Sequence, residues 1–278
     1  MRVVRTPAEV RAELAGAERP LGLVPTMGAM HAGHLALIRR ARAENATVVA
    51  SVFVNPLQFG PNEDFERYPR AFDSDVTQLR DAGVDLVYAP DVATMYPPGF
   101  TTAVDPGSVG ERYEGALRPG HFRGVATVCT KLFATVRPER AYFGAKDAQQ
   151  VAVLQRVVSD LDIGVELVVL PTVREPDGLA LSSRNAYLDP GERAAAPALH
   201  RALDAIADAV RSGERDAQRA VARGRVELRP PLREAYLDVV DPRTFAPEAE
   251  IGAPALAIGS AWLGTTRLID NEPIEART

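Results

Sequence analysis

The chain of 278 residues is poor in the residues that build disulfide frameworks, cysteine metal clusters and membrane spans. Cys129 is its only cysteine, so no disulfide within the chain and no cysteine metal cluster can form. We therefore expect a reducing, cytoplasmic setting. The longest apolar stretch, near residues 48–54, is much shorter than a membrane span, so we expect no membrane partner. The opening segment MRVVRTP is too charged for a secretory signal.

The chain also lacks an excess of basic residues. Its formal net charge of −5 argues against duplex DNA or an anionic membrane as the main partner, because such partners require a basic face. A small anion bound in a local basic pocket stays compatible with this charge. A hydrophobic content of 46% and a charged content of 25% are ordinary for a globular protein. Cys129 lies in an apolar helical pattern, which predicts a buried small side chain rather than a nucleophile.

Apolar segments rich in β-branched residues alternate with segments of helical period over the first 170 residues. The expected strands are residues 21–24, 47–54, 84–88, 141–143 and 165–170. The expected helices are residues 34–44, 72–82, 125–136 and 148–160. This alternation predicts an α/β fold, a Rossmann-like doubly wound parallel sheet with helices on both faces. Ligands of such sheets bind beyond the carboxyl ends of the strands, so we expect the functional residues in the loops there.

The pattern changes after about residue 188. Residues 189–192 have the sequence of a helix start, and the alanine- and arginine-rich stretch that follows is typical of exposed helices. Short expected strands follow at residues 235–240, 255–262 and 266–269. We therefore expect a Rossmann-like domain over residues 1–172 and a second, smaller α+β C-terminal domain over residues 173–278.

The segment MGAMHAGH, residues 27–34, connects the first of these strands to a helix. A helix N-terminus offers unpaired N–H groups and a partial positive charge, and His31 and His34 add directed donors, so the segment is suited to phosphates. Its glycines would let a ligand approach the backbone closely. On its own, the segment is equally compatible with capping or packing. It matches neither the dinucleotide fingerprint nor the ordinary P-loop.

Three further loops offer polar side chains. Gln58 follows the second strand, and Lys146 follows the fourth at the mouth of a helix, where the helix dipole opposes a cation and an anionic ligand would explain it. Gln150 lies one helical turn later. Two hydroxyls and a guanidinium at residues 182–184 form a plausible phosphate clasp.

The helix expected over residues 72–82 carries Asp75 and Gln78, whose oxygen atoms suit magnesium. For that helix alone, a dipole role of its acidic residues is the better explanation.

Seven separated segments then occur in a recognisable order. They are PTMGAMHAGH at 25–34, FVNPLQF at 53–59, YPR at 68–70, RPGHF at 118–122, KD at 146–147, LSSRN at 181–185 and WLGTTRLIDN at 262–271. Together they resemble the pantothenate synthetases (pantoate–β-alanine ligases), a family of the HIGH-motif nucleotidyltransferase-like superfamily, over essentially the entire chain. The resemblance implies condensation of pantoate with β-alanine to pantothenate through a pantoyl adenylate, with release of AMP and pyrophosphate from ATP.

The resemblance also implies residue roles. His34 would be the general acid, acting with His31, Lys146 and Arg184. The ATP-binding positions would be Met27, Gly28, Ala29, Met30, His31, Ala32, Gly33, His34, Gly144, Ala145, Lys146, Asp147, Val173, Leu181, Ser182, Ser183 and Arg184. The substrate positions, for pantoate and β-alanine, would be Gln58 and Gln150, and those near Mg²⁺ would be Asp75 and Gln78. Family members are usually homodimers. Ala145 and Ser74 depart from the frequent Glu and Asp, and the second departure weakens a carboxylate pair for the metal.

Two alternatives stay open at this point. A nucleotidyltransferase of the same superfamily would act on a phosphorylated acceptor, which needs a basic site, whereas Gln58 and Gln150 are neutral. A nucleotide-binding module without turnover would not require His34 and Lys146. The ligase interpretation also gives the smaller domain a role as a lid, because an acyl adenylate must be kept from water.

Overall fold

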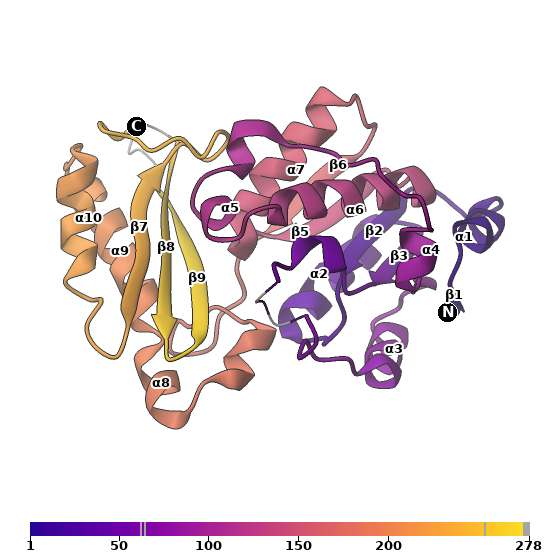
Figure 1. The fold of residues 1–278 in the computed structure, drawn as a ribbon, viewed down its shortest axis with the longest axis horizontal. Coiled ribbons are helices and arrows are strands. Elements are labelled where there is room, and N and C mark those ends of the chain that lie inside the picture. Colours follow the sequence, from indigo (N-terminus) through magenta and orange to yellow (C-terminus); the bar gives the residue numbers. More distant parts are fainter. Residues whose placement is uncertain (62, 64, 253, 275–278) are drawn as a thin grey trace. The chain divides into compact units, whose positions relative to one another are not determined.

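The computed structural model describes residues 1–61, 63, 65–252 and 254–274. It divides into two compact units, one of Met1–Gly144 with Val153–Leu170 and one of Ala145–Ala152 with Pro171–Thr278 (Figure 1). The main division thus falls two residues before the expected position after residue 172. In addition, the short segment after the fourth expected strand groups with the second unit.

The first unit contains a six-stranded sheet and its helices. Its strands are β1 (Arg2–Val4), β2 (Leu21–Thr26), β3 (Thr47–Val52), β4 (Leu86–Tyr88), β5 (Arg140–Gly144) and β6 (Glu166–Leu170). Its helices are α1 (Pro7–Leu14), α2 (Ala32–Glu44), α3 (Phe72–Asp81), α4 (Val92–Met95), α5 (Glu114–Leu117) and α6 (His121–Val136), with short 3₁₀ turns η1 (Pro56–Gln58) and η2 (Gly107–Gly110). Helix α7 (Ala148–Asp160) begins in the second unit and ends in the first.

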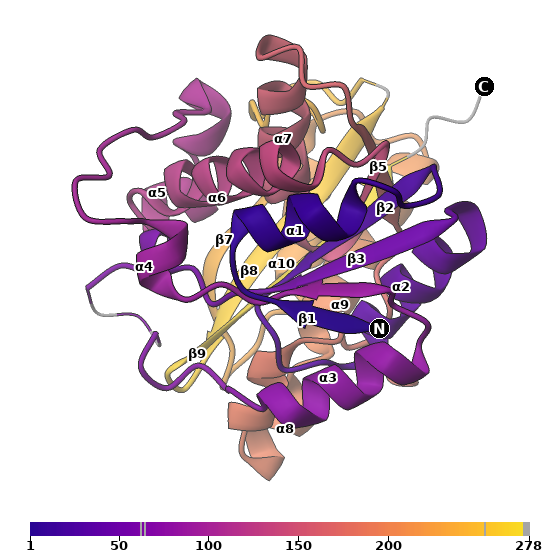
Figure 2. The same cartoon turned by 90° about the vertical axis from the view of Figure 1, so that its right-hand side faces the viewer.

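All pairings in this sheet are parallel, in the order β1-β4-β3-β2-β5-β6. The expected doubly wound sheet is confirmed, with α1 and α6 on one face and α2 and α3 on the other (Figure 2). The order reverses direction at β2, which is the switch point where such folds bind ligands. Thr26 pairs with Val52, so the loops after β2 and β3 leave the sheet at the same edge.

The core between this sheet and helices α2 and α3 consists of buried apolar side chains. Ile38 and Ala41 of α2 and Leu79 of α3 are completely buried against Val48 and Ala50 of β3. The apolar residues of α2 and α3 therefore face the sheet, as their helical spacing predicts. This packing holds α2 in place after the end of β2.

The first unit differs from the expectation in its short elements and in the start of α6. Strand β1 and helices α1, α4 and α5 were not expected. Strand β1 is three residues long and only its Val4 is buried, which leaves little pattern to detect. Helix α6 begins at His121 rather than at residue 125, directly after Gly120, whose φ of 84° turns the chain into the helix.

The second unit contains an antiparallel sheet of β7 (Arg233–Val240), β8 (Ala255–Leu263) and β9 (Thr266–Ile274). Its helical elements are η3 (Ala145–Asp147), η4 (Ser183–Tyr187), α8 (Pro190–Ala195), α9 (Ala198–Arg211) and α10 (Ala217–Arg225). Asp189 and Glu192 form a capping box at the expected helix start. Apolar residues of α9 and α10 pack on the sheet, as expected for a small α+β unit. None of the helices in the described ranges has the length and apolar character needed to cross a membrane.

Candidate active site

The loop after β2 ends in a capped helix N-terminus. His31 is the N-cap of α2, and its Nδ1 accepts a hydrogen bond from the Gly33 N–H at 3.2 Å. Because Nδ1 accepts, the neutral ring carries its proton on Nε2. The His34 ring, in the first turn of α2, stacks on that of His31 with centroids 4.0 Å apart. The sequence motif thus brings both imidazoles to the helix end that attracts anions.

Asp75 of α3 fixes the shape of this loop. Its Oδ2 accepts from the Ala29 N–H at 2.9 Å and its Oδ1 from the Met30 N–H at 2.8 Å, and the residue is only 2% exposed. Gly28 and Ala29 both have positive φ, 83° and 53°. A Cβ on Gly28 would lie 2.8 Å from Asp75 Oδ2, so glycine is required both by the backbone and by this contact.

Asp75 and Gln78 are the two residues expected near Mg²⁺. Asp75 uses a lone pair of each oxygen to bind the loop, and Gln78 donates from Nε2 to Ser74 Oγ at 3.3 Å on the exposed side of α3. The two expected magnesium neighbours thus have different surroundings, one buried beneath the loop and one near solvent.

Gln58 lies beside the same loop. It is buried in η1, where its Nε2 donates to Met27 Sδ at 3.0 Å and its Oε1 accepts from Asn55 Nδ2 at 3.0 Å. The amide keeps one further N–H and one further lone pair for a ligand. Within the first unit, the structure therefore brings the expected pantoate residue next to the expected phosphate loop.

The backbone of Gln58 is held by the N-terminal part of α6 and the segment before it. Its carbonyl accepts from Arg118 Nη2 at 3.1 Å and from His121 Nδ1 at 2.8 Å. A Cβ on Gly124 would lie 2.2 Å from the Leu57 carbonyl oxygen, so α6 can approach η1 only at a glycine. Arg118 is in turn paired with Glu63.

His121 is neutral in this arrangement. Since a carbonyl only accepts, Nδ1 must donate to Gln58, and Nε2, 3.1 Å from Arg118 Nη1, must accept. Burial and, to a smaller extent, the nearby Arg118 lower the pKa of His121 to about 4, which agrees with a neutral ring. Arg118 and His121, both in the segment RPGHF, therefore hold the turn that carries Gln58.

In the second unit, the short turn η3 presents Lys146. Its Nζ lies 3.9 Å from Asp147 Oδ1, and the Lys146 side chain is 19% exposed. Asn271 of β9, itself buried, donates from Nδ2 to the carbonyls of Ala145 and Lys146, both at 2.9 Å. The turn that carries the lysine is thereby bound to the antiparallel sheet. Gln150 lies in the first turn of α7 and is half-buried.

The remaining expected ATP residues form a second cluster in this unit. The Leu181 N–H donates to the Val173 carbonyl at 2.9 Å, and Ser182 caps η4 by accepting from the Arg184 N–H at 3.3 Å. These bonds bring residue 173 next to residues 181–184.

Cys129 is buried in α6, as expected from its apolar surroundings. Burial raises the pKa of its thiol to about 12, so the thiolate needed for nucleophilic attack is disfavoured.

Comparison with known proteins defines the family. Residues 2–273 match the family model described as pantoate-beta-alanine ligase. The chain belongs to the pantoate–beta-alanine ligase family. It is 54% identical to the pantothenate synthetase of Roseiflexus sp. (strain RS-1), with 99% of this chain and 100% of the relative covered.

Solved structures agree with this assignment. The pantothenate synthetase of Thermus thermophilus is 51% identical, with a TM-score of 0.95 and 99% and 100% of the two chains covered. The pantoate-beta-alanine ligase of Francisella tularensis, solved with ATP and β-alanine, is 29% identical, with a TM-score of 0.80 and 100% and 99% covered.

Sequence reasoning did not single out the residues that support the site. Asn271 ends the segment WLGTTRLIDN, but nothing in its spacing indicates that its amide binds the Lys146 turn. The spacing of Arg118 and His121 in the segment RPGHF likewise does not indicate that they bind the Gln58 carbonyl. Their contacts join segments 55 or more positions apart, and such pairings become visible only in the folded chain.

Proposed function

We propose that this chain joins pantoate to β-alanine with the use of ATP, through pantoyl adenylate, and releases AMP and pyrophosphate. The observation that carries this proposal is the family match over residues 2–273, within which the two histidines lie at the N-terminus of α2. The relative solved with ATP and β-alanine supports the same substrates.

The order of chemical steps follows from the reactants. A carboxylate does not acylate an amine at neutral pH, so a pantoate oxygen first attacks the α-phosphorus of ATP and pyrophosphate leaves. The amine of β-alanine then attacks the acyl carbon, loses a proton, and AMP leaves. Neither step needs a protein nucleophile, which agrees with the buried thiol of Cys129.

In the first unit, we assign the phosphates to the loop of residues 27–34. The N–H groups at the start of α2 and the Nε2–H of His31 are fixed donors, and His34 would donate a proton or hydrogen bond to the leaving phosphate. Asp75 and the helix already hold the loop in place. The donors therefore need to move little when the transition state forms.

In the second unit, we assign Lys146 and Arg184 to ATP as well. Both carry fixed positive charge, which stabilises the charge that grows on phosphate oxygens during adenylation. Ala145, Asp147, Val173 and 181–183 of this unit would contact the nucleotide, and so would Gly144, which ends β5 of the first unit.

Gln58 and Gln150 are assigned to pantoate, whose hydroxyls and carboxylate suit neutral amides. The alternative, transfer of AMP to a phosphorylated acceptor, would require cationic groups at these positions and is not favoured by the relatives.

We further propose Mg²⁺ as the partner of ATP, a homodimer as the assembly and the cytoplasm as the location. Both Asp75 oxygens already accept backbone N–H groups, so phosphate and water oxygens are the ligands that Mg²⁺ would mainly use, with Asp75 and Gln78 nearby.

Exchange of labelled pyrophosphate into ATP tests the proposal. With ATP, Mg²⁺ and pantoate but no β-alanine, the chain should exchange label, because the first half-reaction is reversible. Gln58→Ala should raise the KM for pantoate, since a buried amide partner is worth about 1–3 kcal/mol. A folded, ATP-binding preparation that shows no pantoate-dependent exchange and forms no pantothenate with β-alanine would defeat the proposal.

A further inference from the structure

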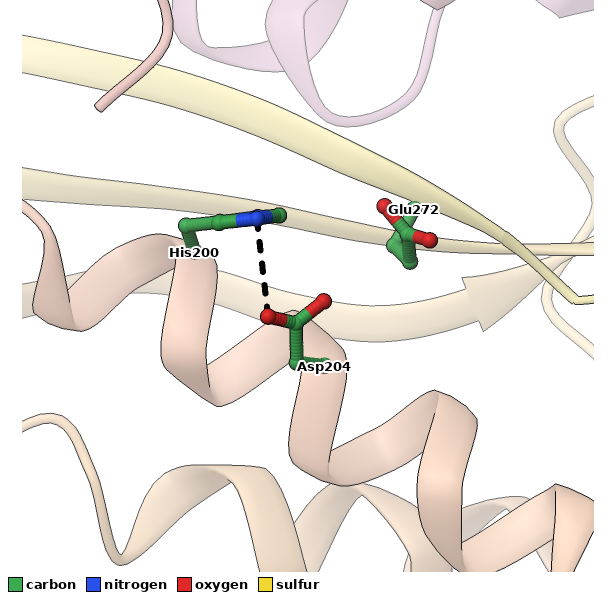
Figure 3. Close-up of side chains that lie close together, drawn as sticks. All are labelled: His200, Asp204 and Glu272. Carbon is green, nitrogen blue, oxygen red and sulfur yellow. Dashed lines mark ion pairs between the residues drawn. The ribbon is translucent and has the colours of Figure 1, made fainter. Parts of the chain in front are cut away.

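A cluster of metal-ligating side chains lies in the second unit, between helix α9 and strand β9. His200 and Asp204 are four residues apart on α9, so they share one face of the helix, and Glu272 projects toward them from β9 (Figure 3). None of these three residues has a role in the proposed reaction.

The distances approach those of a metal site. One ligand atom from each of the three residues lies within 4.8 Å of the other two, and His200 Nε2 is 3.4 Å from Asp204 Oδ2. Tetrahedral Zn²⁺ with bonds of about 2.0–2.1 Å places its ligand atoms roughly 3.4 Å apart. The His200–Asp204 pair already meets that spacing, and the Glu272 carboxylate lies within 4.8 Å of both partners.

A buried carboxylate lies behind the imidazole. His200 Nδ1 is 3.6 Å from Asp270 Oδ2, and this nitrogen is inaccessible to solvent and makes no hydrogen bond to any described residue. Asp270 is held in place by two hydrogen bonds from Arg174, at 2.6 and 3.0 Å. Metal-binding histidines commonly direct their second nitrogen at a carboxylate, which fixes the tautomer and leaves Nε2 to the metal.

The cluster also has more negative than positive charge. Asp204, Asp270 and Glu272 carry three negative charges when ionised, and Arg174, whose shortest contact is with Asp270, supplies one positive charge. Two negative charges are thus left for a divalent cation to balance when His200 is neutral.

We propose that His200, Asp204 and Glu272 bind one divalent transition-metal ion, with Zn²⁺ as the best match, at a site separate from the Mg²⁺ of ATP. An imidazole with two carboxylates suits Zn²⁺, whereas Mg²⁺ prefers oxygen ligands alone. The ion links α9 to β9, the strand whose Asn271 holds the Lys146 turn.

Metal binding to the full-length chain, without ATP, tests this site. Zn²⁺ is titrated by equilibrium dialysis, and Co²⁺ by its visible absorption, both in millimolar Mg²⁺. We expect one equivalent per chain, a higher Tm with Zn²⁺, and binding at least tenfold weaker in His200→Gln and in Glu272→Gln. Asp208→Asn, an exposed carboxylate on the same helix, should bind as the unmodified chain does.

The stacked pair of His31 and His34 also offers two imidazoles to Zn²⁺, so His34→Ala is titrated in parallel. Loss of the equivalent in His34→Ala, with unchanged binding in His200→Gln, would overturn the proposal. A folded chain that binds no Zn²⁺ would overturn it as well. If His200→Gln fails to fold, Glu272→Gln decides the matter by the same measurements.

Discussion

His31 and His34 stack with their ring centroids 4.0 Å apart, but the two rings differ in their contacts with helix α2. His31 caps α2 through Nδ1, whereas His34 lies within the first turn of the helix. Replacing His34 by Ala should therefore leave the fold intact and lower the adenylation rate at least ~100-fold, the loss typical of a positioned proton donor or charge-stabilising group. AMP formation in a single turnover measures this. Near-normal turnover would rule out the assignment of His34.

A pair of variants separates the two roles of His31, as the N-cap of α2 and as a hydrogen-bond donor to the phosphates. Asparagine is a good N-cap, so His31→Asn should keep α2 stable, while His31→Ala should lose about 1 kcal/mol of unfolding free energy. Both variants lack the Nε2–H donor and should lose adenylation activity to a similar degree. If only His31→Ala is impaired, the ring serves the helix and not the phosphates.

Asp75 is expected to act through the loop that it holds. In Asp75→Asn one oxygen becomes an NH₂ group that faces a backbone N–H, so one of the two bonds at 2.8 and 2.9 Å is lost. We expect a stability loss of about 1–3 kcal/mol and a raised KM for ATP. Kinetics over a range of ATP at saturating Mg²⁺ measures the second effect.

Asp73→Asn is the matched control, because Asp73 lies on the same helix and is less buried than Asp75. It should resemble the unmodified chain. Full recovery of the Asp75→Asn variant by higher Mg²⁺ at constant ATP would instead show that Asp75 acts on the metal.

The parallel sheet could be predicted because its strands are apolar on both faces and its helices have a regular period. The same reasoning missed β1, since three residues at a sheet edge leave too short a pattern. Helix α1 did carry a readable signal. Thr6, Pro7 and Glu9 form a capping box with proline at the first helical position, and this could have been found from the sequence.

The site residues divide in a similar way. Residues on the β2–α2 loop could be predicted because the loop follows a strand at the binding edge of the sheet. The role of Asp75 at that loop could not, because acidic residues in the first turn of a helix have an ordinary dipole explanation. Burial and the two backbone hydrogen bonds distinguish Asp75 from Asp73. Neither property can be predicted from the sequence around these residues.

His121 should make stability depend on pH. Its pKa is lowered from 6.5 to about 4 in the folded chain, so the unfolded chain binds the proton more readily. The stabilising effect of a neutral His121 is thus complete above pH 6.5 and is lost progressively as the pH falls toward 4, by up to about 3 kcal/mol. Urea unfolding at several pH values measures it.

His121→Asn keeps an amide donor without a titrating ring. The slope of unfolding free energy against pH between 6.5 and about 4 should therefore be smaller in this variant. Equal slopes in the two proteins would contradict the lowered pKa of His121.

Asn271 should control ATP use through the Lys146 turn. In Asn271→Ala the carbonyls of Ala145 and Lys146 lose their shared donor, so the turn is no longer fixed to β9. We expect kcat/KM for ATP to fall about tenfold, which corresponds to about 1.4 kcal/mol. Ser260→Ala provides the control, because Ser260 is a buried residue of the same sheet whose hydroxyl donates to the Leu268 carbonyl at 2.9 Å. Both variants should lose stability, but only Asn271→Ala should lose ATP efficiency. Equal ATP kinetics in the two would show that Lys146 keeps its position without the Asn271 amide.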